Sequence, residues 1–155
     1  MTPAINSARH AGIAFQLHEY QHDATAPSYG LEAADKLGVT AEQVFKTLVV
    51  SLDGKQLAVG IVPVNSQLGL KQIAKAAGAK KAAMAAPDIV ERTTGYVLGG
   101  VSPLGQKKRL LTFIDASAQA WSTLYVSAGR RGLEIELSPE DLAALSQGRF
   151  AALSA

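Results

Sequence analysis

The chain has 155 residues, of which 48% are hydrophobic and 18% charged, with a formal net charge of +2 and no cysteine. This length and composition predict a single globular domain over residues 1–155, and they exclude disordered and collagen-like chains. The lack of cysteine excludes disulfides, thiolate metal ligands and a cysteine nucleophile, and the apolar runs fall far short of the roughly 20 residues that span a membrane.

The N-terminal segment predicts a helix followed by a strand. Thr2-Pro3 favours a helix over residues 3–12, because a threonine side chain accepts free amides and the fixed φ of proline suits the first turn. Phe15 and Leu17 alternate with polar residues, which predicts a strand at residues 15–20.

Two short helices and a hairpin are expected next. Residues 28–38 begin with a capping serine and end with glycine, and residues 40–43 have the spacing of a capping box for a further helix. Apolar runs at residues 47–52 and 57–62 flank Asp53-Gly54, which is a strong hairpin signal.

The second half continues the mixture of helices and strands. Residues 95–105 contain four glycines and one proline, a composition that favours exposed backbone and a functional loop. The order of elements predicts one mixed α/β domain, since a doubly wound sheet needs regular strand-helix alternation. The other expected elements are helices at residues 70–77, from Pro87 and from Ser138-Pro139, and strands at residues 110–114, 124–126 and 133–137.

Residues 18–22 read His-Glu-Tyr-Gln-His and match the HExxH pattern of zinc proteases. That pattern binds zinc only on a helix, whereas the strand predicted here would separate the two histidines by roughly 13 Å. We therefore expect no metal site. The sequence also lacks the serine-hydrolase elbow, the dinucleotide fingerprint and the phosphate loop, so no cofactor is expected.

Lys46 stands at a predicted helix-to-strand junction, and the loop Gly99-Gly100-Val101-Ser102 offers a row of backbone amides. A lysine in such a place is usually solvated. If Lys46 and the loop share a cleft, the lysine could bind a phosphate or ribose while the amides hold an oxyanion. Both interpretations stay open on the chemistry of these residues alone.

Residues 43–49 read Gln-Val-Phe-Lys-Thr-Leu-Val, and residues 94–108 contain Thr-Gly-Tyr followed by Gly-Gly-Val-Ser-Pro-Leu-Gly-Gln-Lys-Lys. These two segments resemble the YbaK family of trans-editing aminoacyl-tRNA deacylases. The similarity extends over nearly the whole chain. It implies a fold related to the editing domain of bacterial prolyl-tRNA synthetases, with a central mixed sheet or partial barrel surrounded by helices.

The resemblance also implies an activity, removal of cysteine from mischarged Cys-tRNA(Pro). In the chemistry that it suggests, the substrate's own thiol attacks the ester carbonyl, so the enzyme has only to position and polarise the ester. The catalytic residues implied are Lys46, which would contact the terminal nucleotide, and the amides of Gly100, Val101 and Ser102. The residues implied to bind substrate are Tyr20, Tyr29, Thr47, Arg92, Pro103 and Glu136, although the strand pattern turns Glu136 toward solvent.

The small size leaves little room for reading an anticodon, so we expect prolyl-tRNA synthetase as a partner. Lys107-Lys108 and Arg130-Arg131 are candidates to neutralise acceptor-stem phosphates. The N-terminus has no signal-peptide pattern, which predicts a cytoplasmic protein without membrane contact. Two alternatives remain: a deacylase for another small amino acid such as alanine, and a module that binds tRNA or a synthetase without chemistry.

Overall fold

The hairpin predicted at Asp53-Gly54 forms the centre of the larger of two sheets in the computed structural model, which describes residues 1–26 and 28–155. Strands β2 (Phe45–Leu52) and β3 (Gln56–Pro63) pair antiparallel, with Lys46 opposite Val62. The five-stranded sheet has the order β4-β2-β3-β5-β8, in which β5 pairs parallel to both β3 and β8. The edge strands of this sheet are β4 (Ala82–Met84) and β8 (Arg149–Ala151), and β5 (Leu111–Asp115) lies between β3 and β8.

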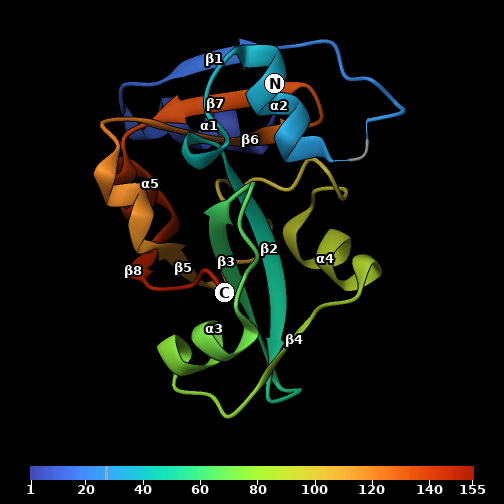
Figure 1. The fold of residues 1–155 in the computed structure, drawn as a ribbon, viewed down its shortest axis with the longest axis vertical. Helices are drawn as coiled ribbons and strands as arrows, with labels where there is room; N and C mark the ends of the chain where they lie inside the picture. The colour runs from blue at the N-terminus through green and yellow to red at the C-terminus, as the bar shows by residue number, and fades with distance from the viewer. Residues whose placement is uncertain (27) are drawn as a thin grey trace.

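The second sheet has three antiparallel strands in the order β1-β7-β6. Its strands are β1 (Gln16–Glu19), β6 (Leu124–Arg130) and β7 (Leu133–Leu137). It lies across the end of the larger sheet where β2 begins (Figure 1), and a parallel bridge between Val44 and Tyr125 joins the two. The mixed α/β class is therefore confirmed, but two adjoining sheets replace the single central sheet expected. They separate because β6 and β7 pair as a local hairpin, and β1 adds to β7 instead of to the larger sheet.

Five α-helices surround the sheets among the described residues: α1 (Pro3–Ala11), α2 (Tyr29–Leu37), α3 (Leu70–Ala77), α4 (Pro87–Thr94) and α5 (Pro139–Ser146). In Figure 1, α1 and α2 accompany the smaller sheet, while α4 and α5 flank the larger one on opposite sides. The predicted caps are confirmed, since the side chains of Thr2, Ser28 and Ser138 each accept a backbone amide of the first turn. None of the helices within residues 1–26 and 28–155 has the length and apolar character needed to cross a membrane.

The capping box predicted at residues 40–43 is wrong. Only a single 3-10 turn, η1 (Ala41–Gln43), forms there, and the Thr40 side chain makes no capping hydrogen bond. The side-chain amide of Gln43 instead donates to the carbonyl of Thr123, at 2.9 Å. A tertiary contact has replaced the local one and fixes the start of β2 against the smaller sheet.

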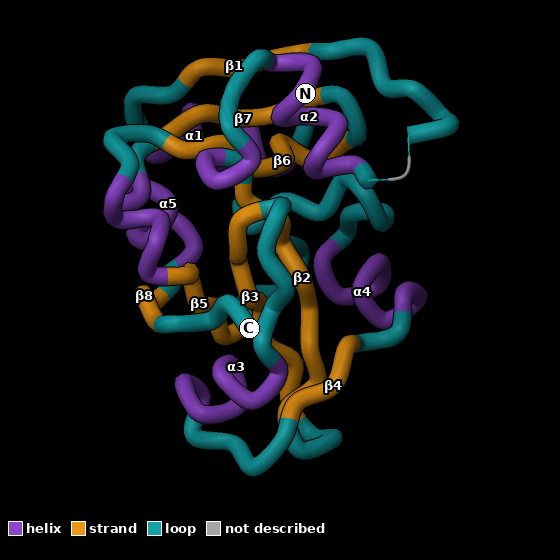
Figure 2. Tube along the Cα trace, viewed as in Figure 1, coloured by secondary structure: helices purple, strands orange, loops and turns teal. Residues whose placement is uncertain are grey.

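The core lies between the two sheets. Phe45 and Ile61 of the larger sheet and Leu124 and Ile135 of the smaller one belong to one buried apolar cluster. The predicted glycine-rich loop is confirmed as part of a long connection without helix or strand between α4 and β5, drawn as loop in Figure 2. Because the core holds β2 and β7 in place, the polar residues at the junction of the sheets are fixed relative to one another.

Candidate active site

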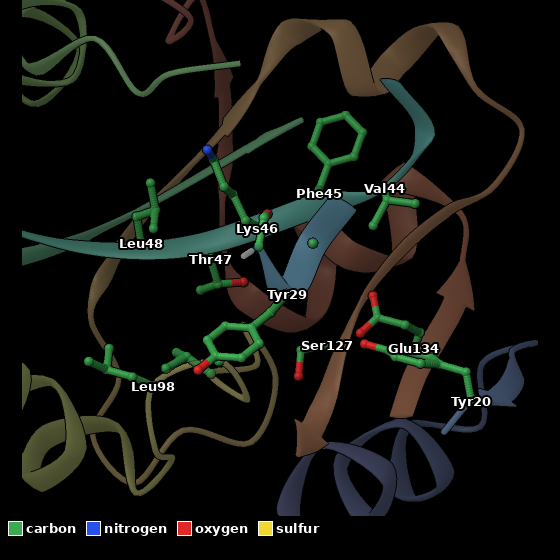
Figure 3. Close-up of a pocket in the computed structure, with 14 residues that line it drawn as sticks. Tyr20, Tyr29, Val44, Phe45, Lys46, Thr47, Leu48, Leu98, Ser127 and Glu134 are labelled. Atoms are coloured by element: carbon green, nitrogen blue, oxygen red, sulfur yellow. The ribbon is translucent and has the colours of Figure 1, made fainter. Parts of the chain in front are cut away.

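A cavity of about 300 Å³ opens where β2 begins beside the smaller sheet. The N-terminal turn of α2, the glycine-rich loop and residues of β6 and β7 complete its wall (Figure 3). A cavity of this size suits a small ligand or the end of a larger one. The residues lining it are Tyr20, Ser28, Tyr29, Gly30, Val44, Phe45, Lys46, Thr47, Leu48, Leu98, Gly99, Val101, Ser127 and Glu134.

Lys46 and Thr47 come from the start of β2. Lys46 is half-buried, and burial lowers the pKa of its amine from the ordinary lysine value. Within the described part of the chain, no carboxylate lies within ion-pair distance of this amine. The buried hydroxyl oxygen of Thr47 likewise has no hydrogen-bond partner among the described residues. Since a buried polar atom without a partner destabilises the fold by about 1–3 kcal/mol, the Thr47 hydroxyl is suited to a ligand, and the unpaired Lys46 amine is suited to an anion.

Glu134 supplies a carboxyl group to the other side of the cavity. The residue is 7% exposed, and burial raises the pKa of its carboxyl to about 8. Burial, together with the neighbouring charge of Glu134, raises the pKa of Tyr20 to about 12. Figure 3 shows the Tyr20 hydroxyl turned toward the Glu134 carboxyl group, while the Lys46 amine lies on the opposite side of the lining residues. The cavity wall therefore carries a carboxyl group on one side and an amine on the other.

Five of the predicted site residues meet in this wall. Lys46, Thr47, Tyr20, Tyr29 and Val101 come from four separate parts of the chain, and the fold brings them around one cavity.

Gly100 is not among the residues that line the cavity, although its neighbours Gly99 and Val101 are, and its amide is already engaged. The Gly100 N–H donates to the Val97 carbonyl at 3.0 Å, so it is not free to hold an oxyanion in this conformation. A Cβ at this position would lie 2.8 Å from the Arg130 backbone, which explains why the loop needs a glycine here. The residue thus shapes the loop.

The structure places Ser102 and Pro103 outside the cavity wall. Ser102 is fully buried, and its hydroxyl accepts the Leu104 amide at 3.2 Å. Pro103 lines a different cavity together with Ser7 and Arg109.

Arg92 and Glu136 also lie away from the wall. Arg92 is exposed on α4 and lies 3.6 Å from Asp88. The Glu136 carboxylate bonds His18 at 2.8 Å and Thr123 at 2.6 Å, so its side chain is held within the smaller sheet and stays only partly exposed to solvent.

The histidines of the HExxH match have separate carboxylate partners. His18 lies on β1, which confirms the strand predicted there, and pairs with Glu136. His22 pairs with Glu32 on α2, at 2.7 Å. No group of three metal-ligating side chains occurs in the part of the chain that the structure describes.

Several lining residues were missed by sequence reasoning, chiefly Glu134, Ser127 and Leu98. For Glu134 a signal existed in the sequence, because it interrupts the apolar run Leu133–Leu137. Glutamates are rarely buried unless they are paired or functional. The same run contains Glu136, and nothing in the pattern says which of the two faces a cavity.

Residues 25–145 match the family described as "Aminoacyl-tRNA editing domain". The chain belongs to this family. As an editing domain, it is 43% identical over 121 residues to the "Putative Cys-tRNA(Pro)/Cys-tRNA(Cys) deacylase EbsC" of Enterococcus faecalis, a match that covers 78% of this chain and 74% of that protein. It is also 29% identical over 115 residues to the "Uncharacterized protein YwhH" of Bacillus subtilis, covering 74% and 73% of the two chains.

The fold of this editing domain has close relatives among solved structures. The "Crystal structure of a putative trans-editing enzyme for prolyl tRNA synthetase" superposes with a TM-score of 0.86 at 22% identity, over 100% of this chain and 99% of that one. At this identity the likeness concerns the fold alone.

Proposed function

We propose that the protein is a trans-editing deacylase that releases cysteine from mischarged Cys-tRNA(Pro). Membership of the editing-domain family and the similarity to EbsC support the reaction class and the substrate. The observation that carries the proposal is the polarity of the cavity, with Glu134 at one end and Lys46 at the other.

An aminoacylated RNA end has the complementary polarity. Its α-ammonium group lies on one side of the ester and its phosphodiester on the other. The ammonium would supply the cation that the Glu134 carboxyl lacks and would favour its ionised form, because a nearby opposite charge lowers a carboxyl pKa. The Lys46 amine would then face the nucleotide side of the ester.

The ester between these two ends needs no metal or nucleophile from the protein. In the proposed reaction the substrate's thiol sulfur attacks the ester carbonyl carbon, and the bond to the ribose oxygen breaks. The thiol proton passes to that ribose oxygen, so the products are free tRNA and a cyclic thiolactone of cysteine. The Thr47 hydroxyl, which points into the cavity in Figure 3, is placed to donate to the carbonyl oxygen as negative charge develops. The Val101 amide is a second candidate donor from the lining.

The test is a set of deacylation rates for Cys-tRNA(Pro), Ala-tRNA(Pro) and Pro-tRNA(Pro) with chelator-treated protein. We expect rapid loss of cysteine alone, with thiolactone as the first product, and no activity in Lys46→Ala. Lys55→Ala, which removes an exposed lysine from the β2–β3 turn, is the matched control and should keep full activity. A folded Lys46→Ala variant with undiminished activity would contradict the role of Lys46.

The same rates separate the competing functions. Loss of alanine in place of cysteine would assign the other specificity, since an alanyl ester has no thiol to attack itself. Binding of charged tRNA without any change in ester lifetime would indicate a binding module.

We further propose that tRNA identity comes from a transient complex with prolyl-tRNA synthetase in the cytoplasm, where tRNA is charged. The size of the chain supports this, since a 155-residue domain that holds the aminoacyl end has little surface left to reach an anticodon. Addition of the synthetase should then lower KM for Cys-tRNA(Pro) and leave KM for a cysteinylated acceptor fragment unchanged.

A further inference from the structure

Arg131 is an exposed residue in the turn between β6 and β7, and its contacts with two residues of the cavity wall place it at the mouth of the cavity. Its guanidinium carbon lies 4.3 Å from the centre of the Tyr29 ring, and its Nη2 donates to the Leu98 carbonyl at 2.9 Å. Tyr29 and Leu98 both line the cavity. One arginine thus connects α2 to the glycine-rich loop beside the opening.

Gly99 allows this close approach. It has a φ of +86°, and a Cβ there would lie 2.5 Å from Arg131 Nε and 2.7 Å from Tyr29 Cε2. The guanidinium is therefore held between the loop backbone and an aromatic face, in a fixed orientation, although the residue as a whole is exposed.

The Arg131 guanidinium contacts only uncharged partners among the interactions found for it within the described residues. Its hydrogen-bond acceptor is a carbonyl, and its stacking partner is a phenol ring. By contrast, Arg130 next to it lies 3.8 Å from Glu19, and Arg92 lies 3.6 Å from Asp88. No carboxylate within the described residues lies in ion-pair distance of the Arg131 guanidinium. The mouth of the cavity therefore carries an oriented cation without a counter-charge.

We propose that Arg131 is a positioning residue that binds a phosphodiester of the RNA 3′ strand just outside the cavity. The inference rests on the proposed function, in which the aminoacyl end fills the cavity and a polyanionic strand must leave through its mouth. A planar guanidinium matches the geometry of a phosphate better than an ammonium does, and stacking on Tyr29 reduces the entropy lost when it binds. Lys46 belongs to the cavity wall, whereas Arg131 would bind the phosphate one step further from the ester.

The test compares substrates with and without a phosphodiester: cysteinyl-adenosine, a cysteinylated CCA trinucleotide and Cys-tRNA(Pro). In Arg131→Gln we expect KM for the trinucleotide and the tRNA to rise roughly tenfold, as for loss of one charge-assisted hydrogen bond, with kcat unchanged. Its kcat/KM for cysteinyl-adenosine should stay within about twofold of wild type. The slope of log KM for tRNA against log salt concentration should decrease by the amount expected for the loss of about one phosphate contact. Arg131→Lys should retain that salt dependence, and Arg149→Gln, on the distant strand β8, should match wild type in every assay.

Equal loss on all three substrates would overturn the proposal, because Arg131 would then only shape the cavity through Tyr29 and Leu98. An unchanged salt dependence in Arg131→Gln would overturn it as well. Binding of uncharged CCA trinucleotide, measured by titration, keeps the test independent of catalysis. If wild type binds this trinucleotide more tightly than Arg131→Gln yet cleaves none of the esters, the phosphate site stands and the proposed function falls.

Discussion

Glu134 and Glu136 point to the same face of β7, yet the fold places their carboxyl groups in opposite electrostatic surroundings. Burial raises the pKa of Glu134 to about 8. Burial also acts on Glu136, but hydrogen bonds from Thr123 and His18 outweigh it and lower the pKa of that carboxyl. The same strand therefore carries the Glu134 carboxyl group, which lines the cavity, and the Glu136 carboxylate, which is hydrogen-bonded within the smaller sheet.

Glu134→Gln should remove a pH dependence of stability. The native state keeps a proton on Glu134 between the unfolded value of 4.5 and about 8, where the unfolded chain has lost it. The free energy of unfolding of the wild type should therefore fall as pH rises through this window, by on the order of 2–4 kcal/mol. In Glu134→Gln the decline should vanish, as measured by urea denaturation at pH 5, 7 and 9. An equally steep decline in the variant would show that another group is responsible.

Glu136→Gln should act with the opposite sign. Because the native pKa is lowered, the ionised Glu136 carboxylate stabilises the fold above the unfolded pKa, and this contribution is lost as pH falls through the native value. The variant should be less stable than wild type at pH 7, and the difference should shrink toward pH 3. Thermal unfolding across that range checks it, and a difference that grows on acidification would contradict it.

Thr47→Val should separate activity from stability. The valine removes a buried hydroxyl that has no partner among the described residues, so the free energy of unfolding should stay equal or rise by up to about 1 kcal/mol. If the hydroxyl donates to the ester carbonyl, kcat should fall roughly 100-fold. Thr112→Val is the control, since the Thr112 hydroxyl already bonds the Leu110 carbonyl outside the cavity, and it should leave kcat unchanged. Full activity in Thr47→Val would exclude Thr47 as a donor.

Loss of the Lys46 charge should weaken substrate binding at high pH, starting below the pH at which an ordinary lysine loses its proton. Burial lowers the pKa of its amine, so the charge that we propose to bind the nucleotide is lost at a lower pH than the usual 10.5. KM for a cysteinylated trinucleotide should rise as pH increases toward that value. Lys46→Arg should shift the rise to higher pH, because a guanidinium stays charged there. If KM rises at the same pH in Lys46→Arg as in wild type, the rise is caused by another group.

Gly99→Ala should open the contact among Arg131, Tyr29 and the loop. An alanine there would adopt a strained positive φ and meet both side chains at less than 3 Å. We expect a loss of roughly 1–2 kcal/mol in stability together with a raised KM. Gly54→Ala has a comparable φ of +67° with no atom within 4 Å of the new Cβ, so it should lose stability without a change in KM. Equal KM values in the two variants would mean that the crowding at Gly99 has no bearing on substrate.

Local signals were read well from the sequence. The caps at Thr2, Ser28 and Ser138 and the hairpin at Asp53-Gly54 depend on neighbours in the chain, so pattern and propensity suffice to predict them. Strands β4 and β8 have only three residues each, too few for an alternation to be visible, and they form because β2 and β5 offer free edges. The error at Gln43 has the same origin, since its partner Thr123 lies 80 residues away in the chain.

The sequence by itself determined the mixed α/β class, and the motifs around Lys46 and Gly99-Gly100 indicated the editing family. Only the tertiary structure decided which polar residues share the cavity. Strand periodicity sets Glu134 and Glu136 on one face, but what packs above each of them is supplied by β1, β6 and the residues after β1. Burial and the pKa of a carboxyl depend on those distant neighbours. The single sequence therefore could not distinguish the carboxyl group that lines the cavity from the one that binds His18.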